Sequence, residues 1–274
     1  MGYTSAYQES VPFKAPRGYS IFIRSEIRLL RKIISVIFHH VIYTSMKVIS
    51  INDVIKRENH DNTENRICYI IMTCDKYLST RVKWQLETCF ENFNRKDLYY
   101  LSYKNGPDPW IYGFNTGDGQ YDVSYKYLGF YKNLSLDYDF YVFIDDDTFV
   151  FPERIQNWLK YIDKNHAYYM GNMCEGSLGN MHGGAGFILT NPVYILLKSL
   201  LKNTDTSTKL WKNGDTQTAL WIKHINKVQA NPITHISDKE FFNITIKGDL
   251  LKSGTFHYLK EQSDYIFFHN LRKK

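Results

Sequence analysis

From Ile67 onward, short apolar runs alternate with segments in which apolar residues recur at helical spacing. Compact apolar runs bounded by polar or glycine-rich residues indicate buried strands, and apolar residues three or four positions apart indicate a helix with one apolar face. Strands are predicted at 67–73, at 98–103 and in the run that ends at Asp145, and helices at 80–93, at 121–133 and after Pro152, Pro192 and Asp215. A loop is predicted at 105–119, and a β-rich tail follows the last helix. This alternation predicts an α/β fold with a mainly parallel, twisted sheet flanked by helices.

The first 65 residues differ from the rest, and we predict an N-terminal segment at 1–65 and one large domain at 66–274. The first twenty residues mix Tyr, Ser, Pro and Gly and are typical of an irregular leader. The uncharged part of the apolar stretch 29–51 is shorter than the roughly 20 apolar residues of a membrane-spanning helix. Its amphipathic pattern predicts a helix that packs on its own domain or makes a peripheral membrane contact through residues 24–51. The polar run 56–66 predicts a linker.

Three consecutive carboxylates, Asp145 to Asp147, end the apolar run that starts at Tyr141. Adjacent negative charges at the end of a buried strand repel one another and lose hydration, unless a cation compensates them. Carboxylate oxygens suit Mg²⁺ or Mn²⁺, and open α/β sheets bind ligands at the carboxyl ends of their strands. The triplet therefore predicts a divalent-metal site. The alternative interpretation is a solvated, inert acidic turn.

Two further motifs are candidates for a site. The run Gly183-Gly-Ala-Gly186 lets a backbone approach a ligand closely, but it leads into an apolar run instead of a helix. That order argues against a dinucleotide or P-loop phosphate cradle, and tight loop packing is the alternative explanation. Asp215 precedes an apolar helical pattern, so it is interpreted either as the N-cap of that helix or as a general base that faces a cleft.

Composition narrows the class of protein. The 274 residues, 43% hydrophobic and 23% charged, are typical of a globular chain with a sizeable core. The net charge of +6 favours anionic partners such as nucleotide sugars, phosphates or a membrane surface. No basic stripe or zinc-ligand spacing is present, so no nucleic-acid partner is expected. Four cysteines without a CxxC pair permit disulfides and require none.

Five segments together resemble a known family. They are Ile71-Met-Thr-Cys74 with Leu86-Glu-Thr-Cys89, Tyr121-Asp-Val-Ser-Tyr-Lys126, Asp145-Asp-Asp147, Gly183-Gly-Ala-Gly-Phe187 and Gly214-Asp215. In this order they are similar to the fringe and β1,3-galactosyltransferase or N-acetylglucosaminyltransferase family. The resemblance covers about the last three quarters of the chain. It implies a GT-A fold, a bound Mn²⁺ and inverting transfer from a UDP-sugar to a glycan or glycoprotein acceptor, with formation of a β1,3 linkage.

The resemblance also assigns roles to the carboxylates. Asp147 is similar to the family's metal ligand, while Asp145 and Asp146 are similar to the residues that hold the ribose and the metal-bound waters. Asp215 matches the carboxylate that serves as base. In the family this position lies in a Glu-Asp or Asp-Asp pair followed by glycine, whereas this chain has Gly214 before it and no glycine shortly after it.

The donor side is assigned in the same way. Thr73 and Arg81 fall where the family grips the nucleotide, and Lys126 falls in the helix that supports the donor. The segment lining the donor sugar and acceptor corresponds to Gly183, Gly184, Ala185 and Gly186. The family supplies a metal-binding histidine near the C-terminus. The element Ser253-Gly-Thr-Phe-His257 resembles its Thr-Ser-His element, so His257 is the predicted ligand, with His235 and His269 as rivals.

Other functions remain open at this point. Asp145-x-Asp147 after a strand resembles the nucleophile motif of haloacid-dehalogenase-like phosphatases, although that motif has Thr or Val where Phe149 stands. A glycosyltransferase-like module that binds nucleotide or glycan without turnover is the second alternative. The family resemblance implies a Golgi or secretory membrane location, and the short N-terminal segment leaves a cytoplasmic enzyme as the other expectation.

Overall fold

A computed structural model describes residues 48–51, 53–54, 65–119, 122–177, 179–205 and 209–273. The chain divides into two units, 1–45 and 46–274, and all described residues belong to the second. The predicted leader, most of the predicted amphipathic helix and most of the predicted linker lie outside the described residues. The end of the apolar stretch 29–51 is described, and there Val48–Ser50 form a strand, β1.

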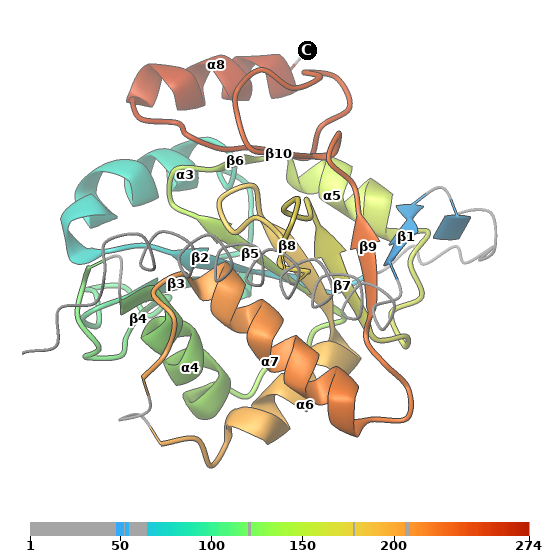
Figure 1. Cartoon of the computed structure of the whole chain (residues 1–274). Helices are drawn as coiled ribbons and strands as arrows, with labels where there is room; N and C mark the ends of the chain where they lie inside the picture. The colour runs from blue at the N-terminus through green and yellow to red at the C-terminus, as the bar shows by residue number, and fades with distance from the viewer. Residues whose placement is uncertain are drawn as a thin grey trace, which may run out of the picture. The chain divides into compact units, whose positions relative to one another are not determined.

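The main sheet of the described residues has eight strands in the order β1-β9-β7-β8-β5-β2-β3-β4 (Figure 1). The strands other than β1 are β2 Ile67–Met72, β3 Leu98–Ser102, β4 Ile111–Gly113, β5 Phe140–Asp145, β7 Tyr168–Gly171, β8 Phe187–Thr190 and β9 Thr234–Ser237. Neighbours pair in parallel except β8, which is antiparallel to both β5 and β7. The prediction of a mainly parallel sheet is confirmed.

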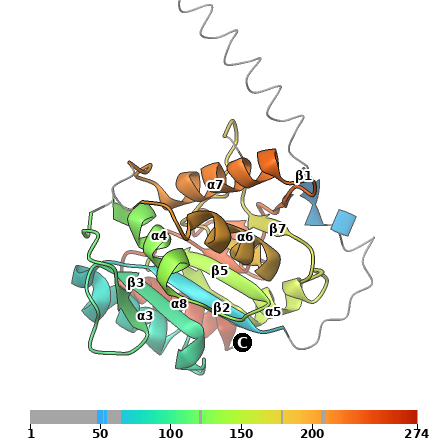
Figure 2. The same cartoon turned by 90° about the horizontal axis from the view of Figure 1, so that it is seen from below.

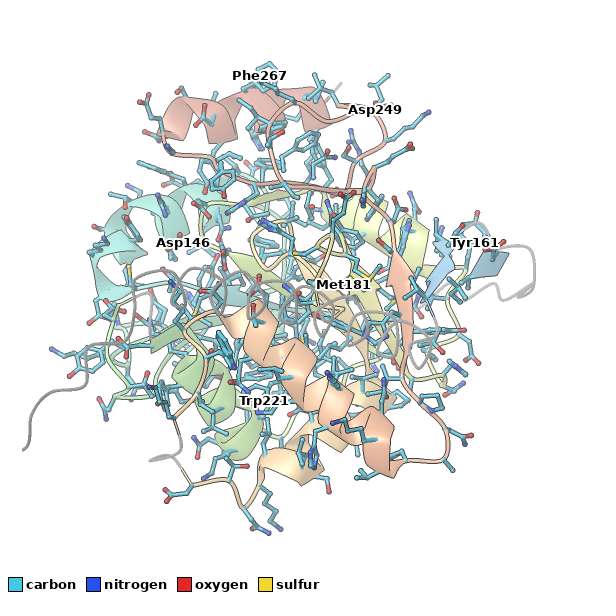
Figure 3. All side chains as sticks on the ribbon, viewed as in Figure 1. Asp146, Tyr161, Met181, Trp221, Asp249 and Phe267 are labelled. Carbon is cyan, nitrogen blue, oxygen red and sulfur yellow. The ribbon has the colours of Figure 1, made fainter. Side chains whose placement is uncertain are left out.

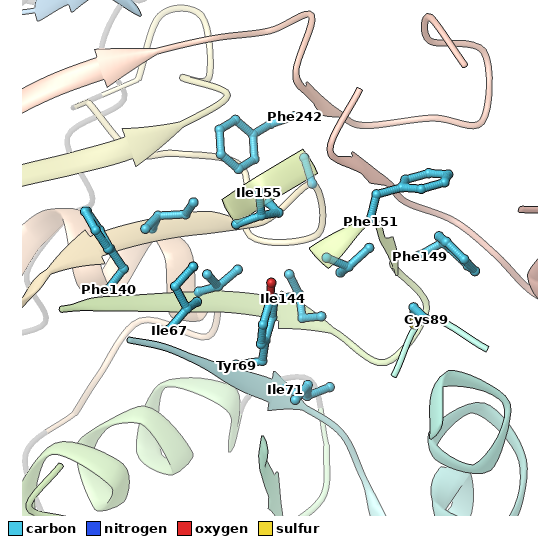
Figure 4. Close-up of a cluster of buried hydrophobic side chains, with 14 of the residues drawn as sticks. Ile67, Tyr69, Ile71, Cys89, Phe140, Ile144, Phe149, Phe151, Ile155 and Phe242 are labelled. Carbon is cyan, nitrogen blue, oxygen red and sulfur yellow. The ribbon is translucent and has the colours of Figure 1, made fainter. Parts of the chain in front are cut away.

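The position of strand β2 in the sheet explains why its sequence is apolar throughout. All six of its residues are buried, because both faces of the sheet are covered. The side chains of Ile67, Tyr69 and Ile71 enter one hydrophobic cluster, which Figure 4 shows together with Phe140 and Ile144 of β5. The alternate side chains of β2 enter a second cluster on the other face, namely Cys68, Ile70 and Met72. All four cysteines of the chain carry free thiols.

Helices cover both faces of the sheet. Three of them, α4 Val123–Asn133, α6 Asn191–Leu201 and α7 Gly214–Val228, pack on the second cluster and lie on the near side in Figure 2. The first cluster is covered by α3 Lys83–Glu87, α5 Pro152–Leu159 and α8 Gln262–Arg272. A small second sheet, β10 Phe242–Asn243, β11 Thr255–Phe256 and β6 Phe149–Val150, lies on that side too. None of the described helices is long and apolar enough to span a bilayer.

Three predicted segments differ in detail. The helix predicted at 80–93 begins as a π-helical turn, η2 Leu78–Val82, continues as α3 and then breaks into turns. Single 3₁₀ turns precede η2 and β3, namely η1 Asp75–Tyr77 and η3 Arg95–Asp97. The predicted loop 105–119 contains β4. The predicted β-rich tail ends in α8, which a reciprocal capping box between Glu261 and Asp264 begins.

Candidate functional site

The acidic triplet lies where two parallel strands end side by side. Asp145 is the last residue of β5, and the Thr148 N–H donates to its carbonyl over 3.2 Å, which closes a turn. The Asp146 N–H donates to the carbonyl of Met72, the last residue of β2, over 3.0 Å. Because β2 and β5 run in parallel, the residue after β2, Thr73, lies beside the triplet. This edge is the expected ligand side of an open α/β sheet.

Strand pairing brings His257 to the triplet from far along the chain. Phe256 of β11 pairs antiparallel with Phe149 of β6, the strand that follows the triplet. The imidazole Nε2 of His257 lies 3.0 Å from a carboxylate oxygen of Asp147 and 4.0 Å from one of Asp145. One possible ligand atom from each of the three side chains lies within 4.8 Å of the others. Among the described residues this is the one such group of metal-ligating side chains.

The electrostatics of this group are unfavourable for carboxylates alone. Burial raises the pKa of Asp145 to about 7, and the charges of Asp147 and Asp146 add to the rise. Burial also raises the pKa of Asp146 despite its hydrogen bonds. His257 is 6% exposed, and its Nδ1 is buried without a hydrogen-bond partner in the described structure. A bound cation would offset the repulsion, and two carboxylates with one imidazole form a donor set that can hold a divalent metal ion.

Asp146 faces a different set of partners. Its carboxylate accepts a hydrogen bond from the Thr73 hydroxyl over 2.7 Å and one from Arg81 over 3.0 Å. Its carbonyl accepts the Tyr265 hydroxyl of α8 over 2.5 Å. The guanidinium of Arg81 stacks on the Tyr77 ring at 4.0 Å and lies 3.6 Å from Asp147. Figure 3 labels Asp146 near the carboxyl end of β5. The side chain of Asp146 thus holds Thr73 and Arg81 in place and does not join the metal-ligating group.

Lys126 is fully engaged inside the protein. It is 2% exposed, and its ammonium donates to the Thr73 carbonyl and to Asp118, both over 2.8 Å. Asp118 also accepts the Asp75 N–H over 2.7 Å. The lysine therefore ties the turn after β2 to the loop before α4. Asp118 and Asp75 were not predicted as site residues, because their importance comes from contacts across 43 positions that no local pattern indicates.

The glycine segment packs directly against His257. A side-chain carbon on Gly184 would lie 2.1 Å from the imidazole Cε1, so only glycine fits there with this ring position. Gly186 adopts a φ of +93°, which favours glycine. The Thr148 hydroxyl donates to the Gly184 carbonyl and the Thr255 hydroxyl to the Ala185 carbonyl, each over 2.6 Å. Close backbone approach to the site explains the run, and tight loop packing is part of the same feature.

Asp215 lies in the first turn of α7, and the N-cap interpretation is wrong. Asn213 occupies the N-cap position, and its side chain makes no capping hydrogen bond. One carboxylate oxygen of Asp215 accepts the N–H of Thr216 over 2.6 Å, and the other accepts the N–H of Gly183 over 3.1 Å. The second contact joins Asp215 to the glycine segment next to His257. The first turn of a helix also stabilises its negative charge.

The residue before the glycines, His182, was not predicted as a site residue. Its N–H donates to the Asn172 carbonyl over 2.7 Å, and its ring nitrogen Nδ1 accepts the Ala185 N–H over 3.3 Å. Its ring centroid lies 5.8 Å from that of His257. Burial and the neighbouring His257 lower its pKa, whereas the charge of Asp215 acts in the opposite direction. His182 thus lies next to the His257 ring, and it directly precedes Gly183, whose N–H donates to Asp215.

The two rival histidines lie elsewhere. His235 is buried in β9 with its ring 5.3 Å from that of Tyr169, and burial lowers its pKa to about 4. His269 of α8 lies 3.6 Å from a carboxylate oxygen of Glu91. Neither joins the group formed by Asp145, Asp147 and His257.

A cavity of about 720 Å³ lies at the opposite ends of the central strands. Its lining includes Ile67 at the start of β2, the exposed Arg66–Asp137 ion pair at 2.9 Å and the Arg272–Glu153 pair. This cavity does not include the acidic triplet, His257 or Asp215. This cavity is thus separate from the metal-ligating group, and the candidate site is identified by its chemistry.

Neither a family model nor a curated protein matches the sequence. Among solved structures, a glycosyltransferase involved in the glycosylation of the major capsid of PBCV-1 is similar, with 12% identity and a TM-score of 0.41, covering 74% of this chain and 99% of that one. The glycosyltransferase GlyE of Streptococcus pneumoniae TIGR4 has 14% identity and a TM-score of 0.41, covering 76% of this chain and 62% of GlyE. An active-site mutant of LgtC has 10% identity and a TM-score of 0.37. The site described above rests on its own geometry.

Proposed function

We propose that this chain is a metal-dependent inverting glycosyltransferase with a GT-A fold. It would move a hexose or N-acetylhexosamine from a UDP-sugar to a hydroxyl of a glycan or glycoprotein, as the fringe-like resemblance implies. One observation carries the proposal. Asp145, Asp147 and His257 converge at the carboxyl edge of the parallel strands, and Asp215 is joined to the same place through the Gly183 N–H.

Asp147 and His257 would hold Mn²⁺, or Mg²⁺, with Asp145 beside them. Their donor atoms and the repulsion among the carboxylates suit a divalent cation. Such a cation supplies Lewis-acid stabilisation for the departing diphosphate. Arg81 would add positive charge on the same side, because it reaches within 3.6 Å of Asp147 and is held in place by Asp146 and Tyr77.

Asp215 would take the proton of the attacking hydroxyl. The N–H groups of Gly183 and Thr216 each donate to one of its oxygens, which fixes the orientation of the carboxylate. The oxygen that accepts the Gly183 N–H keeps a lone pair that can accept the proton, whereas the other oxygen also accepts the Thr216 hydroxyl over 3.3 Å. Attack from the side of Asp215, opposite the diphosphate, inverts the anomeric carbon.

The donor's nucleotide would lie along the turn after β2. Thr73 and Lys126 shape that turn, since the Lys126 ammonium binds the Thr73 carbonyl and the Thr73 hydroxyl binds Asp146. Both act by positioning, because their polar atoms are already paired. The glycine segment 183–186 would let the sugar approach the backbone. We further propose the peripheral membrane contact through residues 24–51 and a secretory-membrane location from the family resemblance alone.

The decisive test is UDP release from a panel of UDP-sugars, each assayed with Mn²⁺ and with excess EDTA. The acceptors are simple glycosides that offer free hydroxyls. We expect turnover of at least one donor with Mn²⁺ and none with EDTA. Turnover unaffected by EDTA would refute the metal role. Phosphate release from a generic phosphoester, without UDP release, would favour the phosphatase, and UDP-sugar binding without turnover would favour the binding module.

A further inference from the structure

His182 is held in one orientation by contacts on three sides. Its backbone N–H is bonded to Asn172, its Nδ1 accepts the Ala185 N–H, and its ring lies against that of His257. An acceptor nitrogen carries no proton, so the hydrogen-bond network assigns the single proton of the neutral ring to Nε2. The imidazole is therefore a fixed N–H donor.

The donor group of His182 has no use within the described structure. No hydrogen bond or ion pair of Nε2 occurs among the described residues, and Nε2 is not among the buried atoms that lack a partner. The side chain as a whole is half-buried. A rigid N–H that is open to solvent and lies next to a candidate site is preorganised to bind an oxygen of a ligand.

The position of His182 indicates which part of the ligand it meets. Its ring centroid lies 5.8 Å from that of His257, on the metal side, and the next residue, Gly183, donates its N–H to Asp215, the proposed base, over 3.1 Å. In a single displacement the transferred sugar lies between the leaving diphosphate and the attacking hydroxyl. We infer that the Nε2–H of His182 donates a hydrogen bond to a hydroxyl of the transferred sugar and makes the enzyme discriminate among donors at that hydroxyl. This inference rests on the proposed function.

Two substitutions separate the donor from the fold. In His182→Asn the side-chain oxygen can still accept the Ala185 N–H, as Nδ1 does, but nothing replaces Nε2. In His182→Gln the longer side chain carries an amide donor close to the position of Nε2. If discrimination among donors is lost in His182→Asn and recovered in His182→Gln, the effect comes from the missing N–H donor and not from a disturbed glycine segment. Asp137→Asn, in the distant cavity, is the control for general effects of substitution.

The experiment compares the best UDP-sugar with its monodeoxy analogues. For the wild type, we expect one analogue to lose about 10- to 100-fold in kcat/KM, since a donor that the bound sugar covers and leaves unpaired discriminates against a missing hydroxyl. In His182→Asn that difference should shrink to within about threefold, and His182→Gln should restore part of it. Calorimetric binding with Mn²⁺ should show the same pattern for UDP-sugars, while the affinity for UDP itself stays within about twofold.

The outcomes are distinct. If His182→Asn discriminates against every deoxy analogue as the wild type does, the inference is wrong. If no donor turns over but the binding pattern appears, the contact of His182 with the sugar stands and the proposed transfer activity is wrong. If UDP does not bind in the presence of Mn²⁺, both fail together.

Discussion

The two ends of the central strands differ in the balance of their cationic and anionic side chains. At the end where β2 and β5 start, the cavity lining contains three cationic side chains, Arg66, Lys96 and Arg272, and three carboxylates, Asp97, Asp137 and Glu153. Two ion pairs join four of these groups. At the other end four carboxylates gather, Asp145, Asp146, Asp147 and Asp215, and Arg81 is the one cationic side chain paired with any of them among the described residues.

This difference distinguishes charged groups that neutralise one another from charged groups that need a ligand to neutralise them. A balanced set of charges at the surface is satisfied by its own members, by neighbouring carbonyl groups and by water, so it needs no further partner. In the acidic set, burial and the neighbouring carboxylates raise the pKa of Asp145 to about 7. Carboxylates held this close together raise the free energy of the folded protein, and a bound cation would lower it. We therefore propose the acidic end as the functional one, although the cavity of about 720 Å³ lies at the other end. The following predictions test this contrast, from the largest expected effect to the smallest.

Asp147→Ala should have the largest effect. It removes the carboxylate closest to His257, so Mn²⁺ affinity should fall sharply and UDP-sugar turnover should drop by more than about 10³-fold. The fold should persist, because the change also removes repulsion from Asp145. UDP release, calorimetry with Mn²⁺ and circular dichroism measure the three quantities. Full activity in this variant would remove Asp147 from the site.

Asp215→Asn should leave binding intact and stop transfer. The amide oxygen can still accept one of the two backbone N–H groups, but an amide does not accept the proton of the attacking hydroxyl. We expect kcat to fall by about 10²- to 10⁴-fold, the usual contribution of a general base. UDP affinity, measured by calorimetry, should not change. An unaltered kcat would move the base to another residue.

Gly184→Ala should loosen the metal site without touching a ligand. The new methyl group would collide with the His257 ring at 2.1 Å, so the ring must turn away from Asp147. We expect Mn²⁺ affinity to fall by about 10- to 100-fold, as for other changes that disturb ligand orientation. Gly183→Ala is the matched comparison, because its methyl group would meet Asp215 at 3.2 Å and should affect transfer more than Mn²⁺ affinity. Equal Mn²⁺ affinities in the two variants would contradict this geometry.

His235→Gln should change the pH dependence of stability and leave turnover unchanged. The folded-state pKa of His235 is lowered to about 4, below its ordinary value of 6.5. As the pH falls below 6.5, the unfolded chain binds a proton that the folded chain does not, so the histidine costs stability between pH 6.5 and 4. Removing it should narrow the gap in unfolding free energy between pH 7 and pH 5 by about 2 kcal/mol. Urea titrations at both pH values measure the gap, and an unchanged gap would show that His235 is not held neutral.

Asp137→Asn should have the smallest effect. The Arg66–Asp137 pair is exposed, with 55% and 81% of the two side-chain surfaces open to solvent. Water replaces the lost partner, so neither the urea midpoint nor UDP release should change measurably. A loss of turnover in this variant would show that the end with balanced charges has a role in function, which would contradict the proposed difference between the two ends.

Many of the strands and helices could be predicted because the pattern of neighbouring residues indicates them. The buried strand β2 and the strand that ends in Asp145 are continuous apolar runs, and Pro152 marks the start of α5. Helix α8 was not predicted, since Tyr265, Ile266, Phe267 and Phe268 are four consecutive apolar residues and hide the helical period. In the folded protein Tyr265 and Phe268 are buried, while Ile266 and Phe267 are 46% and 54% exposed.

The partners across the site could not be predicted from local pattern. The link between Lys126 and Thr73, the grip of Arg81 on Asp146 and the contact of Gly183 with Asp215 join positions 32 to 65 residues apart. A side chain's sequence context does not indicate which distant backbone group it will meet. The position of His182 was not recognised for this reason, because His257 follows β11 and Asp215 belongs to α7.

The sequence by itself determined the classes of elements and the presence of three adjacent carboxylates that repel one another, because hydrophobic period and charge repulsion are properties of neighbouring residues. Only the tertiary structure decided that β8 runs antiparallel, that His257 and not His235 or His269 joins the aspartates, and that Asp215 lies within the helix and not at its cap. Those outcomes depend on which strands pair and on the path by which distant segments of the chain reach the site. Burial of the whole core fixes such pairings, and no short stretch of residues does.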